Sequence, residues 1–410
     1  DTSKHADYSI VRPSHLSIEQ QMSLCQRCHL QGITVLKEGK TFYDFRPGME
    51  LSDIMNVFLP RYKDDDQFIM ASQADRLRMS KCYIESEELS CITCHDPHKT
   101  VQSISIDFFN SKCISCHLDE ANVCTEEISI RSASDDNCSG CHMPGSGSVD
   151  IPHVSITDHK IQKPISNEET DRIRTFVELE CRTDPKADDL TMALGYLNYV
   201  ERFGGGDIAM KTAHQLLFSS KIKNDTSLVK AQIHYFFLRN DLEQIIKVVS
   251  ETESIKISDP WTNYRISEAY TSSGKSNLAL QFLNLALQSK SKHLDFLIKK
   301  GNLLATLERY VEARNVYSQI IELNPKYGKA YTNLGYLTIL EGKANEAISL
   351  YNEALKLNPD DEQALLNMAG AYISTQQFET AIHYLNLCLQ VNPTNKRAQD
   401  ILNQLTNQNN

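Results

Sequence analysis

The sequence lacks a long hydrophobic run, an excess of positive charge and an initiating Met. No stretch of the 410 residues approaches the run of about 18 apolar residues that a membrane-spanning helix needs, so we expect a soluble or peripheral protein without a membrane span. Lys and Arg number 42 against 53 Asp and Glu, which argues against nucleic acid as a partner. The chain begins at Asp1 without the basic and apolar segments of a signal peptide, so we expect that any such peptide has been removed.

Cysteine is nearly missing from the second half of the chain. Only Cys181 and Cys388 follow residue 142, and we expect both to pack in a core rather than take part in chemistry. The other Cys of the 12 lie before residue 143. A chain of 410 residues is also too long for one ordinary hydrophobic core. Its length and the uneven distribution of Cys together predict two domains, residues 1–164 and 165–410.

Eight of the early cysteines lie in four copies of the pattern C-x-x-C-H. Chance alone would give roughly 0.01 copies in a chain of this composition. Two thiols about one helical turn apart suit the two vinyl groups of a porphyrin, and the adjacent imidazole can then bind the iron. The pattern therefore predicts four covalently attached c-type haems. The predicted attachment and iron-binding residues are Cys25, Cys28, His29, Cys91, Cys94, His95, Cys113, Cys116, His117, Cys138, Cys141 and His142.

Covalent haem attachment also bears on where the protein works. The ligation system lies outside the cytoplasm in prokaryotes and requires reduced thiols, so we expect a periplasmic or extracellular protein. A zinc ribbon is the alternative interpretation of the paired C-x-x-C sites. Cys82 and Cys124 belong to no motif, and the sequence leaves open whether they form a disulfide or are two buried thiols.

Each haem iron has a second axial position that a further side chain can fill. The haem-binding half of the chain contains nine His, four of them in the motifs, and the other five are predicted to be these distal ligands. They are His15, His98, His153, His159 and His5, of which His5 is expected to reach a haem of a neighbouring subunit. Met is the rival ligand and would raise the reduction potential. The Met residues of this region are Met22, Met49, Met55, Met70, Met79 and Met143.

Chain length restricts which iron each His can bind. His98 lies three residues after His95, a span of at most about 10 Å, which is too short to pass round a porphyrin to its other face. His98 is therefore predicted to bind the iron of a neighbouring haem. His153 and His159 are six residues apart, up to about 20 Å in extended chain, and are predicted to serve two different haems.

The haem-binding half offers too little chain for a conventional core. Three motifs lie between residues 91 and 142, so we predict that the haems themselves form the core of a loop-rich domain. Short helices are predicted over residues 16–25 and 66–84. Residues 1–164 carry 16 Lys and Arg against 24 Asp and Glu, which favours a basic redox partner.

A regular spacing of small residues and Pro runs through the second half of the chain. The residues in register are Pro325, Pro359 and Pro393; Ala313, Ala347 and Ala381; and Gly301, Gly335 and Ala369. The spacing is that of tetratricopeptide repeats, in which small residues lie where two helices approach closely. We predict the best repeats over 294–393, a fair one over 261–289, degenerate ones over 190–250 and a capping helix over 396–405. The predicted fold class is mostly α, a tetrahaem domain followed by an all-α repeat solenoid.

Four stretches of residues 1–164 resemble a family of multihaem c-type cytochromes fused to tetratricopeptide repeats. They are residues 45–48 (FRPG), 80–98, 138–144 (CSGCHMP) and 150–159. The His-Asp-Pro-His form that begins at His95 is also shared with multihaem nitrite and hydroxylamine enzymes and with electron-carrier cytochromes. The resemblance implies closely stacked haems, each with two His ligands, and electron transfer.

Electron transfer with redox partner proteins is the function that the sequence favours. Two His per iron leave no open position for a substrate, so we expect no enzyme activity. A ligand such as His5, far from any local haem, would let subunits join into a homo-oligomer or an extracellular filament. One alternative is an oxidoreductase of the nitrite or hydroxylamine type, which requires a five-coordinate haem. The other is a redox-sensing scaffold whose repeats bind a protein or peptide.

Overall fold

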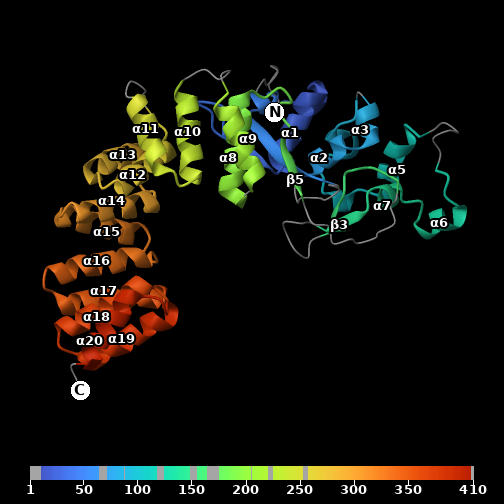
Figure 1. Cartoon of the computed structure of the whole chain (residues 1–410). Coiled ribbons are helices and arrows are strands. Elements are labelled where there is room, and N and C mark those ends of the chain that lie inside the picture. Colours follow the sequence, from blue (N-terminus) through green and yellow to red (C-terminus); the bar gives the residue numbers. More distant parts are fainter. Residues whose placement is uncertain are drawn as a thin grey trace, which may run out of the picture. The chain divides into compact units, whose positions relative to one another are not determined.

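The computed structural model divides the chain into two compact units, residues 1–222 and 223–410 (Figure 1). The ranges that the structure describes are 11–63, 72–86, 88–117, 124–147, 155–163, 175–204, 206–219, 225–252 and 257–407. None of the helices in these ranges has both the length and the hydrophobicity needed to span a bilayer.

The first unit is built on a three-stranded antiparallel sheet of β1 (Ile33–Leu36), β2 (Met55–Tyr62) and β5 (Phe176–Cys181), in the order β1-β2-β5. Phe58 in the central strand lies opposite Ile33 on one side and Cys181 on the other. The sequence-based prediction of a loop-rich helical domain contained no sheet. The longest strand of the sheet, β2, contains Pro60, which is unusual inside a strand and obscures the strand pattern in the sequence. Its pairing partner β5 lies far along the chain.

Both faces of this sheet are covered. Alternate residues of β2 point to opposite faces. Helix α8 (Asp189–Phe203) packs on the face of Phe58, where Gly195 leaves room for the ring: a Cβ on Gly195 would lie 3.0 Å from it. On the other face Val57 and Leu59 form a core with residues that include Leu30 and Leu51.

Strand β5, with α8 and α9 (Asp207–Leu217), belongs to the first unit. That unit therefore extends well past residue 164, where the sequence-based prediction ends the haem-binding domain. The reason is the backbone pairing of β5 with β2, which binds residues 176–181 to the same sheet as residues 55–62.

The helix α1 (Ile18–His29) follows the 3₁₀ turn η1 (Pro13–His15). Ser17 and Gln20 form a reciprocal capping box at its start, in which each side chain accepts the other's backbone N–H. The helix over 16–25 predicted from the sequence is confirmed, with its end at His29 rather than Cys25.

The helix predicted over 66–84 is two helices, α2 (Gln73–Arg78) and α3 (Lys81–Glu85), and residues 64–71 lie outside the described part of the chain. Ser80 separates the two. Its hydroxyl accepts the N–H of Tyr83 and caps the start of α3. A helix-breaking cap inside an apolar periodic stretch accounts for the difference from the prediction.

The remaining elements of the first unit are short. Helices and 3₁₀ turns of a few residues surround the motifs, and a hairpin follows the last motif. They are η2 (Leu51–Asp53), α4 (Cys91–Cys94), η3 (Val101–Ser103), α5 (Ile106–Ile114), α6 (Ile128–Ala133), α7 (Cys138–His142), β3 (Gly145–Gly147) and β4 (Ser155–Thr157).

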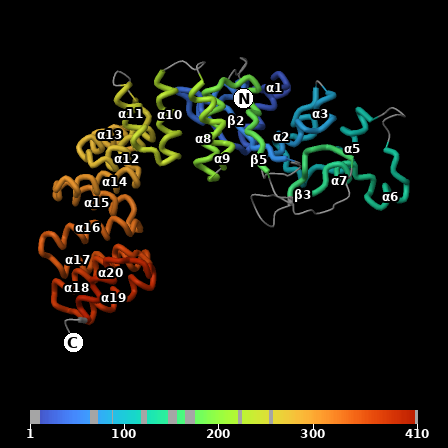
Figure 2. The backbone as a smooth tube through the Cα atoms, in the orientation of Figure 1, coloured from blue at the N-terminus to red at the C-terminus, as the bar shows by residue number. Residues whose placement is uncertain are grey.

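The second unit consists of antiparallel helix pairs, and its backbone turns back at the end of each helix (Figure 2). Its helices are α10 (Thr226–Leu238), α11 (Leu242–Glu251), α12 (Pro260–Ser272), α13 (Ser276–Ser289), α14 (Leu294–Thr306), α15 (Tyr310–Leu323), α16 (Gly328–Leu340), α17 (Ala344–Leu357), α18 (Glu362–Ser374), α19 (Phe378–Val391) and α20 (Lys396–Asn407). The helix pairs expected over 261–289 and 294–393 and the capping helix expected over 396–405 are all present.

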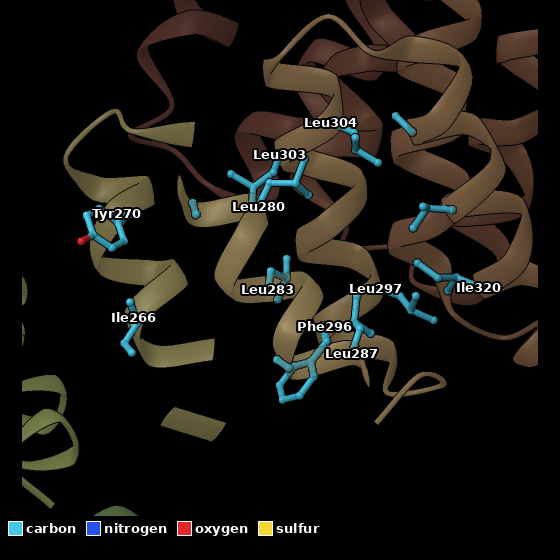
Figure 3. Close-up of a cluster of buried hydrophobic side chains, with 14 of the residues drawn as sticks. Ile266, Tyr270, Leu280, Leu283, Leu287, Phe296, Leu297, Leu303, Leu304 and Ile320 are labelled. Atoms are coloured by element: carbon cyan, nitrogen blue, oxygen red, sulfur yellow. The ribbon is translucent and has the colours of Figure 1, made fainter. Parts of the chain in front are cut away.

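The small residues in register lie where the helices of a pair touch. A Cβ on Gly335 of α16 would lie 2.5 Å from the Tyr351 ring of α17, and Gly301 meets the Tyr317 ring in the same way one repeat earlier. Large apolar side chains fill the space between pairs, among them Leu283, Phe296 and Leu304 (Figure 3). Cys388 is fully buried in the last such core and Cys181 is buried in the sheet, which confirms both as packing residues.

Candidate functional site

All four C-x-x-C-H motifs lie on helical turns. The first ends α1, the second is α4 followed by His95, the third begins in the last residues of α5, and the fourth is α7. In the second motif the His95 N–H donates to the Cys91 carbonyl at 3.0 Å, and in the third the His117 N–H donates to the Cys113 carbonyl at 3.1 Å. This geometry places the two thiols of a motif about one turn apart, as a porphyrin with two vinyl groups requires.

The described residues of the segment that carries three of the motifs are almost all outside a buried core. Among the residues that the structure describes between 81 and 142, only Ser90 is buried. Large apolar side chains there are exposed instead; they are Ile84, Val101, Ile106, Phe108, Ile114, Ile128 and Ile130. Exposed apolar side chains at this density are characteristic of a surface that is covered by something else.

The thiols of the first and second motifs are neighbours. The interaction between the Cys25 and Cys91 thiols lowers the pKa of Cys25 to about 7 and, together with burial, raises that of Cys91. Met22 of α1 lies beside them, with its Sδ 3.8 Å from the Cys91 Sγ. The Ser90 hydroxyl donates to the Gln21 side chain at 2.6 Å and ties α4 to α1. Two predicted attachment sites that are far apart in the sequence therefore lie side by side.

The third and fourth motifs form a second pair. The Asn110 side chain of α5 accepts the N–H of Cys138 at 3.1 Å and donates to the Asp136 carbonyl at 2.9 Å. Burial, followed by the nearby thiols of Cys138 and Cys94, raises the pKa of Cys113 to about 11. Asn110 thus acts as a bridge between the helices of the two motifs.

Two of the predicted iron ligands face one another. The His95 and His159 rings lie 6.0 Å apart between centroids, with their planes 28° from parallel. The Nδ1 of His159 is 3.0 Å from the Thr157 carbonyl. Burial lowers the pKa of both imidazoles, and the charges of His29 and of the partner ring lower it further for His159. The Phe109 ring meets His95 edge-on at 6.2 Å.

A buried ion pair holds the segment of His159. Arg76 of α2 contacts Asp158 through two hydrogen bonds of 2.8 and 2.5 Å, and both side chains are at least nine-tenths buried. The Asp158 N–H also donates to the Pro144 carbonyl at 3.1 Å. No pattern in the sequence indicated this pair, because the two residues are separated by the entire motif-bearing segment.

The same segment also orients the His of the fourth motif. The Nδ1 of His142 is 3.0 Å from the Gln162 carbonyl, and the Gln162 N–H donates to the His142 carbonyl at 3.2 Å. A ring nitrogen that is engaged in this way leaves the other, Nε2, for a metal.

A second ion-pair cluster lies in the sheet. Arg61 of β2 contacts Asp75 of α2 at 3.0 Å and Glu180 of β5 at 2.6 Å, and Arg182 contacts both acids. Burial would raise the pKa of Glu180, but the two guanidinium groups outweigh it and the pKa lies below its usual range. This cluster joins β2, β5 and α2 and is structural.

Not every predicted iron ligand lies beside another predicted ligand, as His159 lies beside His95. His15 and His98 are exposed, and His5 and His153 lie outside the described residues, so polymerisation through His5 stays a prediction. Of the rival Met ligands, Met22 and Met55 are buried, and Met49 packs against the sheet core.

Cys82 and Cys124, the two Cys of residues 1–164 that belong to no motif, are not joined. Cys82 and Cys124 are free thiols, which contradicts a disulfide between them. Neither is buried, so they are not the two buried thiols of the alternative interpretation either.

Met70, another of the rival ligands, lies outside the described residues.

In the described part of the chain, no three or more His, Cys, Asp or Glu side chains gather where they could hold a metal ion. A haem iron takes only two protein ligands, so a haem site consists of two imidazoles and two thiols rather than such a cluster.

Amide side chains of the repeats are hydrogen-bonded to one another. Asn302 of α14 accepts hydrogen bonds from the Tyr317 hydroxyl and from the Asn333 amide of α16, each at 2.8 Å. Gln363 donates to Asn367 of α18 at 2.7 Å. Asn333 and Asn367 lie at the same position of successive repeats.

Comparison with known proteins identifies the repeats. Two tetratricopeptide repeat family models match residues 298–362 and 338–405, which confirms the repeat prediction for this part of the chain. A search of the curated proteins finds no match.

Solved structures of repeat proteins are similar to parts of the chain. MamA from Desulfovibrio magneticus RS-1 shares 17% identity over 42% of this chain and 98% of its own, with a TM-score of 0.38. YrrB, described as a tetratricopeptide repeat protein with an unusual peptide-binding site, shares 18% over 51% and 98%, with a TM-score of 0.36. The first such domain of Spaghetti (RPAP3), bound to an HSP90 peptide, shares 24% over 28% and 90%, with a TM-score of 0.27. Because these scores are low, the repeat assignment rests on the family models.

Proposed function

We propose that the first unit binds four c-type haems through its C-x-x-C-H motifs and transfers electrons between partner proteins outside the cytoplasm. The observation that carries this proposal is the scarcity of buried side chains among the described residues between 81 and 142. This segment holds three motifs and exposes seven large apolar side chains, and a folded segment of that composition needs a hydrophobic filling that the protein does not supply.

The arrangement of the motifs fits closely spaced haems. Cys25 lies beside Cys91, and Asn110 joins the third motif to the fourth, so the attachment points form two adjacent pairs. A bound haem supplies a one-electron Fe(III)/Fe(II) couple, which accepts an electron from a reduced partner protein and donates it to an oxidised one. The residues His29, His95, His117 and His142 would each hold one iron from the side of the thiols.

Electron transfer is favoured over nitrite or hydroxylamine chemistry. Such an enzyme needs an iron with an open position, and all four motifs of this chain end in the ordinary His. The His159 ring, 6.0 Å from His95, would give one of the sites a second imidazole.

Haem content tests the proposal. The protein produced with an exported haem-ligation system should be red and carry four covalent haems per chain, measured by denatured mass and by the pyridine haemochrome spectrum. Replacing Cys138 and Cys141 by Ser should lower the content to three. The matched control is Cys82→Ser, which removes a nearby thiol that belongs to no motif and should leave four. A colourless protein, or a Cys82 variant that loses one haem, would contradict the proposal.

We also propose that the repeats dock a protein partner through an extended segment. Amide side chains such as Asn302 and Asn333 can donate to and accept from a peptide backbone, and Asn367 repeats the position of Asn333 in the next repeat. The same surface would serve a redox-sensing scaffold, which would differ in exchanging electrons slowly with partner cytochromes.

Phage-displayed random peptides provide a probe for this docking surface. Peptides selected on the full chain should bind the Asn302→Ala/Asn333→Ala variant about thirtyfold more weakly, because each of the two lost hydrogen bonds contributes about 1 kcal/mol. Asn345→Ala, an exposed amide on α17, is the control and should bind as the parent does. Equal binding by both variants would show that the peptides use another surface.

A further inference from the structure

We propose that His159 is the second axial ligand of the haem attached at Cys91 and Cys94, on the face opposite His95, and that the Arg76–Asp158 ion pair positions it. This inference rests on the proposed haem-binding function. It assigns one distal ligand to one haem, which chain-length arguments alone leave open.

The separation of the two rings carries the assignment. Two imidazoles on one metal, with metal–nitrogen bonds of about 2 Å each, have ring centroids roughly 6 Å apart. The His95 and His159 centroids are 6.0 Å apart. His95 is bound to this site by its own motif, so the facing ring is the natural occupant of the other axial position.

The orientation of His159 agrees with this role. Its Nδ1 lies 3.0 Å from the Thr157 carbonyl, which holds the proton on Nδ1 and leaves the lone pair of Nε2 for iron. A backbone acceptor of this kind fixes both the tautomer and the plane of a ligating ring. A surface His would need neither.

The other described His candidates do not fit this position. His98 is exposed and too close in sequence to His95 to reach the opposite face of the same porphyrin. His15 is also exposed, and its 3₁₀ turn makes no ring contact with His95. His29 influences both rings electrostatically, but its place in the first motif assigns it to the adjacent haem.

Arg76 and Asp158 are positioning residues. Asp158 immediately precedes His159, and its carboxylate is held by both the Nε and the Nη2 of Arg76 in a site closed to solvent. The bidentate geometry fixes the backbone on which His159 stands. The Asp158 N–H also donates to the carbonyl of Pro144, shortly after the fourth motif. The segment that follows the fourth motif thus brings His159 to the haem of the second motif.

Ligand exchange in the full haem-loaded chain tests the assignment. His159→Met should convert one of four haems from two His ligands to His and Met, which raises one of four reduction potentials and adds the charge-transfer band of a Met-ligated iron. His383→Met, an exposed residue of α19, is the control and should leave the spectrum unchanged. An unchanged spectrum in the His159 variant would overturn the inference.

A variant that lacks the haem of the second motif shows which haem His159 binds. When Cys91 and Cys94 are replaced by Ser, His159→Met should have no further spectral effect, because its haem is gone. A Met-ligated haem that persists in that background would assign His159 to a different iron and overturn the inference, while the proposed function would stand. A parent chain without covalent haem would instead overturn the proposed function.

A separate measurement tests whether the ion pair of Arg76 with Asp158 positions His159. Arg76→Met in the otherwise intact chain should make about a quarter of the haem partly high-spin by electron paramagnetic resonance, and added imidazole should restore the low-spin form. Arg76→Lys should retain more of the low-spin signal. A fully low-spin Arg76→Met protein would show that the ion pair does not position His159.

Discussion

A chain produced without covalent haem is expected to be cut by protease throughout residues 81–147, while residues 225–407 remain intact. The motif-bearing segment has only Ser90 buried between residues 81 and 142 in its described part, whereas the repeats bury apolar side chains in several clusters along their length. A segment that cannot bury its apolar side chains does not offset the entropy of ordering its backbone. Limited proteolysis followed by mass spectrometry of the fragments measures the difference.

The haem-loaded chain is the control for this experiment. It should resist cleavage between residues 81 and 147 under the same conditions, and a variant with all eight motif Cys replaced by Ser should behave as the haem-free chain does. If the haem-free segment is as resistant as the loaded one, the protein has a core there that does not depend on haem, and the proposal loses its main support.

Gly335→Ala is expected to destabilise the repeats by roughly 2–3 kcal/mol, because the new methyl group meets a fully buried ring. A Cβ at this position lies 2.5 Å from Tyr351, which is fully buried at the contact between α16 and α17. The ring cannot move without opening the helix pair. Urea unfolding followed by circular dichroism at the helix wavelength measures the change in the free energy of unfolding.

Gly370→Ala is the matched control. Gly370 also lies inside a helix, α18, but it is exposed and a Cβ there has nothing within 4 Å. The substitution should stabilise the repeats by about 0.5–1 kcal/mol, since Ala restricts the unfolded chain and favours the helix. Equal effects of the two substitutions would show that the Gly335 contact is relieved by a shift of the helices.

The repeats were the most predictable part of the fold. Their helix pairs follow from small residues such as Ala347, which recur once in every repeat and are buried where helices meet. Each repeat contacts only its sequence neighbours, so the pattern that specifies it is local.

The sheet and the facing His pair were not predictable from local pattern. Phe58 pairs with Cys181, and His95 faces His159, across long stretches of chain that carry no signal of either contact. The His residues themselves were predicted to be ligands from their number beside four motifs. Which of them lie together depends on the fold, and the ion pair of Arg76 with Asp158 holds the segment that carries His159.

The pairing of β2 with β5 has a consequence for how the protein can vary. The Lys63 N–H donates to the Thr175 carbonyl at 2.9 Å, so the chain leaves the sheet and returns to it at one point. Three of the four motifs lie on the excursion between these residues, which is an insertion into a hairpin. Doubling the length of such an insertion costs only about 0.6 kcal/mol of closure entropy. The number of motifs it carries can therefore change while the sheet and its covering helix stay as they are.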